Sequence, residues 1–130
     1  MPHLVFEYTD NLGPEADIRD LLRQAAGILA GQDGVFPTGG IRVRAIRLEE
    51  YCIADGLHPD DAFVHATLKI GAGRGEAAKR KVCDELFAAM TGHFATAFAS
   101  RGLALSLELQ EFSEGGTLKK NNLHARYKVP

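Results

Sequence analysis

Residues 62–70 read AFVHATLKI, and this run decides the predicted fold. Every second residue, from Ala62 to Ile70, is apolar, while the positions between them include His65 and Lys69. Alternation with a period of two is typical of a β-strand whose two faces meet different environments. The run therefore predicts a strand with one apolar face turned to a core and one polar face turned away from it.

A helix and another strand are predicted directly after this run. The glycine-rich turn GAGRG at 71–75 leads into a long helix that ends near Arg101-Gly102, because apolar residues recur at helical spacing. This stripe consists of Val82, Leu86, Met90, Phe94, Ala97 and Phe98. Four leucines then alternate with other residues over 103–110, which predicts a strand with one apolar face. Residues 61–112 thus form one predicted βαβ unit.

The N-terminal half repeats the same order of elements. A strand is predicted over 4–8, a helix from about Pro14 to Ala30, and a second strand around Ile41 to Ala45. The unit covers about residues 2–60, so the chain is predicted to be a duplicated βαβ within a single domain spanning 1–130. The C-terminal tail, residues 113–130, looks loop-like and could pack on a neighbouring subunit.

This duplication predicts the fold class. A strand joined to the next through a helix implies parallel pairing and a right-handed crossover. Two such units predict an α/β (α+β) fold with a four-stranded mixed sheet and two helices on one face. The other face would carry His3, Glu7, His65, Lys69, Ser106 and Glu108. Two interpretations remain open for it: a wet channel enclosed by a ring of subunits, or a face open to solvent.

Composition excludes several classes of protein. The net charge of -2 and the pI near 6.2 argue against binding of nucleic acid by positive charge. We predict no membrane span, because no apolar run reaches eighteen residues, and a cytoplasmic location, because the start lacks a signal-peptide pattern.

Cys52 and Cys83 form no motif for a disulfide framework or a zinc site and are predicted to be small core residues. A metal site of His3, Glu7 and His65 is disfavoured, since hydrogen-bonded histidines are much commoner than ligands, so no metal is predicted.

Pro2 is the candidate catalytic residue. A small residue after the initiator methionine normally allows removal of Met1, and the product is a secondary amine on a rigid ring. A cationic neighbour would disfavour the protonated form and bring the pKa of this amine toward the working pH, as a general base requires. Many proteins carry proline here without a catalytic role. The strand that begins immediately afterwards raises the prospect of catalysis, because it would hold the terminus inside the fold.

Three arginines are candidates for binding carboxylates. Arg42 and Arg44 lie two apart on one face of a predicted strand, and Arg74 lies in the glycine-rich turn before a helix. Planar guanidinium groups suit carboxylates. The alternative, equally open for each of them, is an exposed arginine that pairs with an acid such as Glu49 or Glu50. The turn matches neither a P-loop nor the GxGxxG pattern, so nucleotide binding is not predicted.

Several motifs in sequence order resemble one known family. They are PH at 2–3 with Glu7 and DN at 10–11, GIRVR at 40–44, ADG at 54–56, FVHATLKIGAGR at 63–74 and NNLHA at 121–125. Over essentially its whole length the chain resembles the 5-carboxymethyl-2-hydroxymuconate isomerase family of the tautomerase superfamily.

The resemblance implies a fold, an assembly and a reaction. The expected protein is a tautomerase-like homotrimer that needs neither metal nor organic cofactor. Pro2 would be the general acid/base that moves a proton within an unsaturated hydroxy-polycarboxylate. Arg42 and Arg74 match positions that hold substrate carboxylates, and Arg44 is a further candidate. The implied setting is catabolism of an aromatic acid such as homoprotocatechuate.

Two other functions remain open at this point. A related enzyme of the same fold would use the same proline to hydrate or dehalogenate a small unsaturated acid. A non-catalytic binding module of the migration-inhibitory-factor kind would need no free proline amine. Retention of Met1 in the native host would favour the binding module, whereas its loss leaves both enzymes open.

Overall fold

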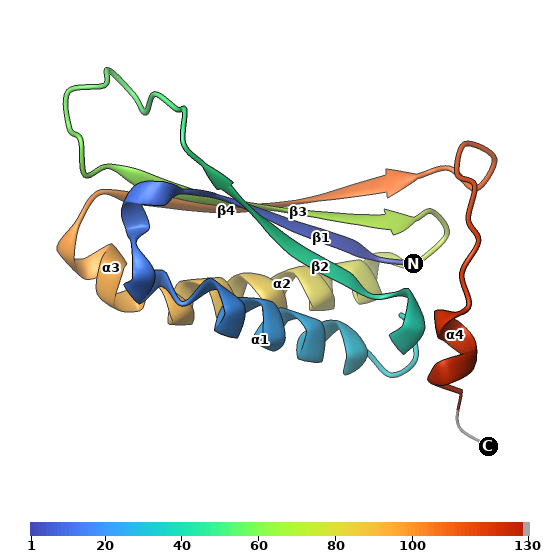
Figure 1. Cartoon of the computed structure of the whole chain (residues 1–130). Helices are drawn as coiled ribbons and strands as arrows, with labels where there is room; N and C mark the ends of the chain where they lie inside the picture. Colours follow the sequence, from blue (N-terminus) through green and yellow to red (C-terminus); the bar gives the residue numbers. More distant parts are fainter. Residues whose placement is uncertain (129–130) are drawn as a thin grey trace.

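A four-stranded sheet carries two long helices on one of its faces (Figure 1). The structure, a computed structural model, describes residues 1–128. The first half contains β1 (His3–Thr9), α1 (Ile18–Ala30) and β2 (Arg42–Leu48). The second half contains β3 (Ala62–Gly71), α2 (Glu76–His93) and β4 (Leu103–Phe112). Short helical segments connect or follow these elements: η1 (Asp10–Leu12), η2 (Pro14–Ala16), η3 (Thr38–Gly40), α3 (Ala95–Ser100) and α4 (Leu123–Arg126).

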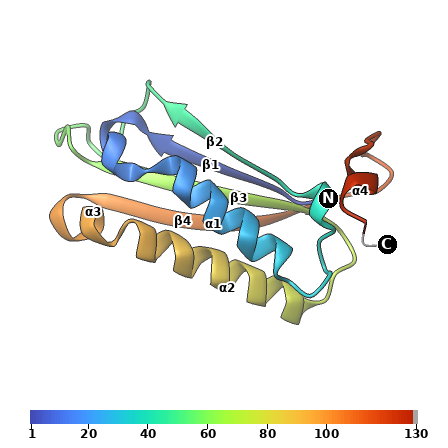
Figure 2. The same ribbon diagram turned by 60° about the horizontal axis from the view of Figure 1, so that its bottom comes forward.

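The topology of the sheet confirms the predicted duplicated βαβ. The strand order is β2-β1-β3-β4, with parallel pairing inside each half and antiparallel pairing between β1 and β3. Figure 2 shows α1 and α2 side by side on the same face of the sheet. The predicted mixed sheet with both helices on one face is therefore correct.

The core lies between the sheet and these two helices. Leu4 and Phe6 of β1 pair with Leu68 and Ala66 of β3, and all four side chains are buried. The helices complete the core with residues one helical turn apart: Leu21, Ala25 and Leu29 from α1, and Val82, Leu86 and Met90 from α2. Removal of this apolar surface from water is the main force that holds the two layers together.

Both predicted helices differ from the observed ones at an end. Residues 14–16 form the 3-10 turn η2, and α1 begins only after Asp17, which has a left-handed backbone with φ of 40°. Its carboxylate accepts a hydrogen bond from the backbone N–H of Asp20 at 3.4 Å and caps the helix. The second helix is interrupted at Phe94, whose φ of -99° and ψ of 17° leave helical geometry while its side chain stays buried in the core.

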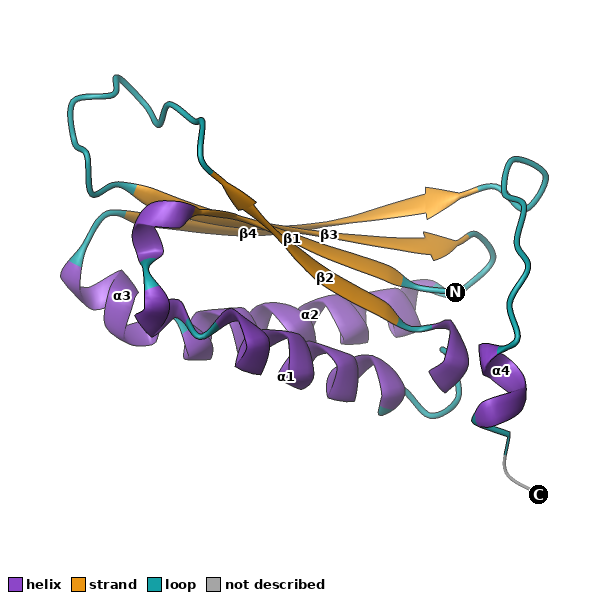
Figure 3. Cartoon of the chain, viewed as in Figure 1, coloured by secondary structure: helices purple, strands orange, loops and turns teal. Residues whose placement is uncertain are grey.

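The tail and the cysteines also depart from expectation. The tail is not all loop, because α4 forms in it and packs against η3 of the same chain. Cys52 is exposed in the long connection between β2 and β3, which projects away from the sheet (Figure 3), and Cys83 is only half-buried. The prediction that both are core residues is thus wrong, since Cys83 lies at the edge of the apolar stripe of α2. Within residues 1–128, no helix has the length and hydropathy that a bilayer span requires.

Candidate functional site

Pro2 is held inside the fold at the start of β1. Its side chain is buried, and its carbonyl oxygen accepts a hydrogen bond from the backbone N–H of Arg42 at 3.0 Å. This bond extends the pairing of β1 with β2 by one residue beyond the pair His3 and Arg42. The N-terminus is therefore anchored at one end of the sheet, as the position of the predicted strand indicated.

A cavity of about 380 Å³ opens beside this terminus. Its lining comes from four parts of the chain: the terminus itself, the connection between α1 and η3, the end of β3 with the turn after it, and the end of β4 with the tail. The lining residues are Met1, Pro37, Gly71, Arg74, Phe112, Glu114, Lys119, Lys120, Asn121 and His124. Figures 1 and 2 both place the N-terminus close to α4. Three lining cations against one carboxylate make the cavity attractive to an anion.

Arg74 is the most firmly placed of these cations. Its Nη1 donates to the carbonyl oxygen of Gly71 at 3.0 Å, and its Nη2 donates to that of Val35 at 3.2 Å. The guanidinium carbon lies 4.9 Å from the centre of the Phe36 ring, in cation–π geometry. These contacts fix the plane of the guanidinium, so that its remaining N–H groups are pre-oriented for a ligand.

Arg42 and Arg44 lie in different surroundings from Arg74. Arg42 Nη1 donates to the carbonyl oxygens of Gly39 at 2.8 Å and Ile41 at 3.1 Å, which places the guanidinium near the terminus but outside the cavity lining. Arg44 is exposed on the polar face of the sheet, where its Nη1 lies 3.1 Å from Nδ1 of His3. The fold therefore brings Arg74 to the terminus and Arg42 close to it, but it leaves Arg44 elsewhere.

The charges around the cavity act on the terminal amine. Burial lowers the pKa of the Met1 amino group, and the positive charges of Arg74, Lys119 and Arg42 lower it further, while the carboxylate of Glu114 opposes them. Burial, followed by the charge of Arg44, likewise lowers the pKa of His3. An amine at this end of the sheet is thus held less protonated than one in water.

The tail residues of the cavity were not among the candidates from sequence. Lys119 and Lys120 directly precede the NNLHA motif, whose position after the last strand says nothing about where it folds. The structure shows that the tail returns to η3. A Cβ atom at Gly39 would lie 2.8 Å from Cα of His124, so glycine at this position permits the close approach.

The polar sheet face has hydrogen-bonded histidines. Nδ1 of His65 lies 2.6 Å from Oγ of Ser106, and Nε2 lies 3.1 Å from Oε1 of Glu108. Among the described residues, no group of three or more His, Cys, Asp or Glu side chains is arranged to hold a metal ion.

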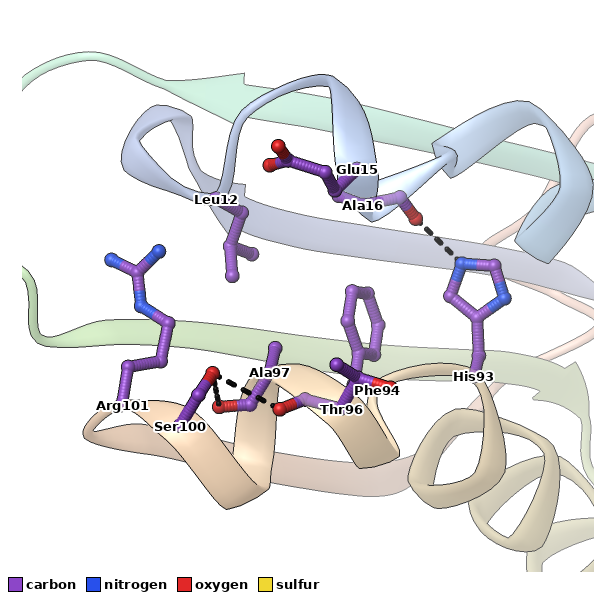
Figure 4. A pocket seen from close by; sticks show the side chains of 9 residues that line it. All are labelled: Leu12, Glu15, Ala16, His93, Phe94, Thr96, Ala97, Ser100 and Arg101. Atoms are coloured by element: carbon purple, nitrogen blue, oxygen red, sulfur yellow. Dashed lines mark hydrogen bonds between the residues drawn. The ribbon is translucent and has the colours of Figure 1, made fainter.

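A second cavity, of about 420 Å³, lies between η2 and α3 at the other end of the sheet (Figure 4). Leu12, Phe94 and Ala97 give it an apolar wall. Its two basic side chains are used in the fold, because His93 Nε2 lies 2.6 Å from the carbonyl oxygen of Ala16 and Arg101 Nη1 donates to that of Asn11 at 3.0 Å. The cavity at the N-terminus is therefore the better candidate for chemistry.

Comparison with known proteins decides the family. The sequence profile of 5-carboxymethyl-2-hydroxymuconate isomerase matches residues 2–127. The chain belongs to the 5-carboxymethyl-2-hydroxymuconate isomerase family. It is 42% identical over 128 residues to the 5-carboxymethyl-2-hydroxymuconate Delta-isomerase of Escherichia coli, an alignment that covers 98% of this chain and 100% of that protein. The resemblance stated from sequence and the expectation of an isomerase are both confirmed.

Solved structures of the isomerase family have the same fold. The crystal structure of a 5-carboxymethyl-2-hydroxymuconate isomerase from Deinococcus radiodurans R1 is 58% identical, with a TM-score of 0.94 over 98% of this chain and 95% of that chain. A 5-carboxymethyl-2-hydroxymuconate delta-isomerase structure is 31% identical, with a TM-score of 0.89 over 100% of this chain and 95% of that chain. A fused 4-OT symmetric trimer, 19% identical with a TM-score of 0.65 over 92% of each chain, shows a likeness of fold alone. The tautomerase-like fold class is confirmed.

Proposed function

We propose that this isomerase moves a proton within 5-carboxymethyl-2-hydroxymuconate or a closely similar unsaturated hydroxy-polycarboxylate, with the nitrogen of Pro2 as general acid and base. The observation that carries the proposal is a buried Pro2 at the start of a strand, beside a cavity lined with cations. Removal of Met1 would expose the proline nitrogen to this cavity. The names of the relatives in the family support the substrate.

The proposed reaction is an internal transfer of one proton. The unprotonated proline nitrogen accepts a proton from one position of the conjugated substrate and returns it to another. Burial and the charges of Arg74 and Lys119, which lower the pKa of the Met1 amine, would act in the same direction on a proline amine at this place. The general base would then be available near neutral pH.

Cations at the cavity would bind the carboxylates of the substrate. Arg74 and Arg42 are the proposed carboxylate-binding residues, and they would also stabilise negative charge that develops on the substrate oxygen. Arg44 stays a candidate on the sheet face. Because it lies beside His3, it could bind substrate only if the substrate extends from the cavity to His3. The proposed setting is cytoplasmic catabolism of an aromatic acid such as homoprotocatechuate.

We further propose a homotrimer. The sheet face opposite the helices carries polar and half-buried groups together with Ile46, a residue that is 47% exposed, and a fused 4-OT relative in fold is described as a symmetric trimer. Sedimentation equilibrium should give the mass of three copies of the 14.1 kDa chain. A monomer at micromolar concentration would contradict the trimer and leave this sheet face open to solvent.

A panel of substrates tests the proposed reaction against its rivals. Protein verified by mass to begin at Pro2 should ketonise a 2-hydroxymuconate dienol in a continuous absorbance assay. Haloacrylates and their alkyne analogues should remain unchanged. Turnover of these acids in place of the dienol would favour the hydratase or dehalogenase, and no turnover of either set would favour the binding module.

The pH dependence of the reaction should respond to the charge at Glu114. A protonated proline cannot accept a proton, so kcat/KM should fall as the pH drops below the pKa of the amine. The Glu114 carboxylate raises the pKa of the Met1 amine and should act in the same direction on the proline amine of the processed protein, so Glu114→Gln should lower that pKa and extend activity to lower pH. A pH–rate profile measures the shift, with Glu111→Gln on β4 as a control outside the cavity lining. An acid limb that moves to higher pH would contradict the assignment of the base.

A further inference from the structure

The tail contributes positive charge to the cavity that sequence motifs do not explain. Lys119 and Lys120 both line the cavity, and both belong to the stretch between β4 and α4. Lys79 of α2 pairs with Glu76 at 2.8 Å and Glu111 at 3.3 Å. In contrast, neither Lys119 nor Lys120 has a carboxylate partner within ion-pair distance among residues 1–128. Of these two lysines, Lys119 is the one whose charge lowers the pKa of the Met1 amine, so its ammonium group acts on the terminus. Its ammonium group is available to a ligand.

The tail is ordered on both sides of Lys119. On one side, a turn is closed by bonds to Ser113, whose Oγ accepts from the N–H of Gly116 at 3.1 Å and whose carbonyl oxygen accepts from Oγ1 of Thr117 at 2.8 Å. On the other side, α4 packs against η3, where His124 closely approaches Gly39. The segment that carries Lys119 therefore runs along the wall of the cavity between two ordered parts of the tail.

The proposed substrate has one carboxylate more than the two arginines near the terminus. The compound for which the family is named has three carboxylates, two at the ends of the muconate chain and one on the carboxymethyl group. Arg42 and Arg74 supply two guanidinium groups near the terminus, and the carboxylate of Glu114 would repel a third anionic group. A tricarboxylate therefore needs one more cation at this cavity.

We infer that Lys119 binds the third carboxylate of the substrate, which makes the tail the element that selects tricarboxylates over dicarboxylates. This inference rests on the proposed function, because it takes the cavity at Pro2 as the substrate site. It adds a specificity-determining residue from a segment more than one hundred residues away in the chain from the proposed base.

Equilibrium binding tests this inference without relying on catalysis. Isothermal titration calorimetry on the protein that begins at Pro2 would use tricarballylate as the tricarboxylate probe and glutarate as the dicarboxylate probe. Lys119→Ala should weaken tricarballylate by about tenfold, equivalent to about 1.4 kcal/mol, and glutarate by less than about twofold. Lys119→Arg keeps the charge and should retain most of the preference. Lys128→Ala removes the same charge from the tail outside the cavity lining and should change neither affinity.

Kinetics provide a second measurement on the same variants. Lys119→Ala should raise KM for 5-carboxymethyl-2-hydroxymuconate about tenfold and KM for 2-hydroxymuconate by less than about twofold. The inference would be overturned if Lys119→Ala changed the affinity or KM equally for tricarboxylates and dicarboxylates, or if Lys128→Ala had the same effect as Lys119→Ala. Either result would show only a general loss of positive charge. Selective binding by a protein that does not turn over the dienol would support Lys119 while overturning Pro2 as the base.

Discussion

Protein that keeps Met1 should be folded and almost inactive. The Met1–Pro2 peptide bond turns the proline nitrogen into an amide without a basic lone pair, and Met1 itself lines the cavity. Loss of a general base typically lowers a rate by about 10²- to 10⁴-fold. We expect a decrease of this size in dienol ketonisation when the two forms, distinguished by mass spectrometry, are compared at equal concentration. The fold should be retained, because the described structure includes Met1 with Pro2 buried and β1 fully paired.

Pro2→Ala provides the graded control for this experiment. Removal of Met1 from this variant leaves a primary amine, which still accepts a proton but lacks the ring that directs its lone pair. Activity should therefore lie between those of the processed and the Met1-retaining proteins. If protein that keeps Met1 turned over the dienol at the full rate, Pro2 would not be the base. The role would then pass to a side chain such as His3 or Glu7; burial and the charge of Arg44 lower the pKa of His3, which favours its neutral form.

Arg74→Ala should produce the second large loss of activity. The guanidinium lines the cavity and is oriented by its bonds to Gly71 and Val35, so its removal takes away a charge-assisted contact with a substrate carboxylate. A hydrogen bond to a charged group contributes about 1.5 to 3 kcal/mol, which corresponds to about a 10- to 150-fold decrease in kcat/KM for a dicarboxylate. The decrease in kcat/KM should be smaller for a monocarboxylate analogue, because this analogue lacks one of the carboxylates that the arginines bind.

Two further variants separate binding from structure at this position. Arg74→Lys keeps the charge but cannot donate to two carbonyl oxygens and a ligand in one plane, so it should recover only part of the activity. Arg42→Ala should have a smaller effect than Arg74→Ala, since Arg42 lies outside the cavity lining. Equal losses on dicarboxylate and monocarboxylate would indicate that Arg74 acts only by holding the turn after β3. Thermal unfolding of each variant would show such a structural effect directly.

Local patterns in the sequence were sufficient to predict the architecture. The alternation in 62–70 and the helical spacing of Val82, Leu86 and Met90 arise from the periods of strand and helix, which depend on neighbouring residues alone. Chirality then restricts each strand–helix–strand unit to one connection, so the sheet and its helix-covered face follow. The limits of these patterns appear where side chains from distant segments meet. The second helix was predicted to continue to about Arg101, but Phe94 leaves helical geometry with its side chain in the core.

The sequence predicted some residues of the candidate site but not where the fold places them. A proline at position 2 before a strand is a local feature, and so is an arginine in a turn before a helix, which is why Pro2 and Arg74 could be named without a structure. Only the tertiary structure decided that Arg74 lies at the terminus while Arg44 lies against His3 on the sheet face. It also decided that Lys119 comes to the same cavity, because the return of the tail depends on the fit of His124 against Gly39. Such contacts between distant segments depend on shape and burial in the complete fold, and no local period in the sequence encodes them.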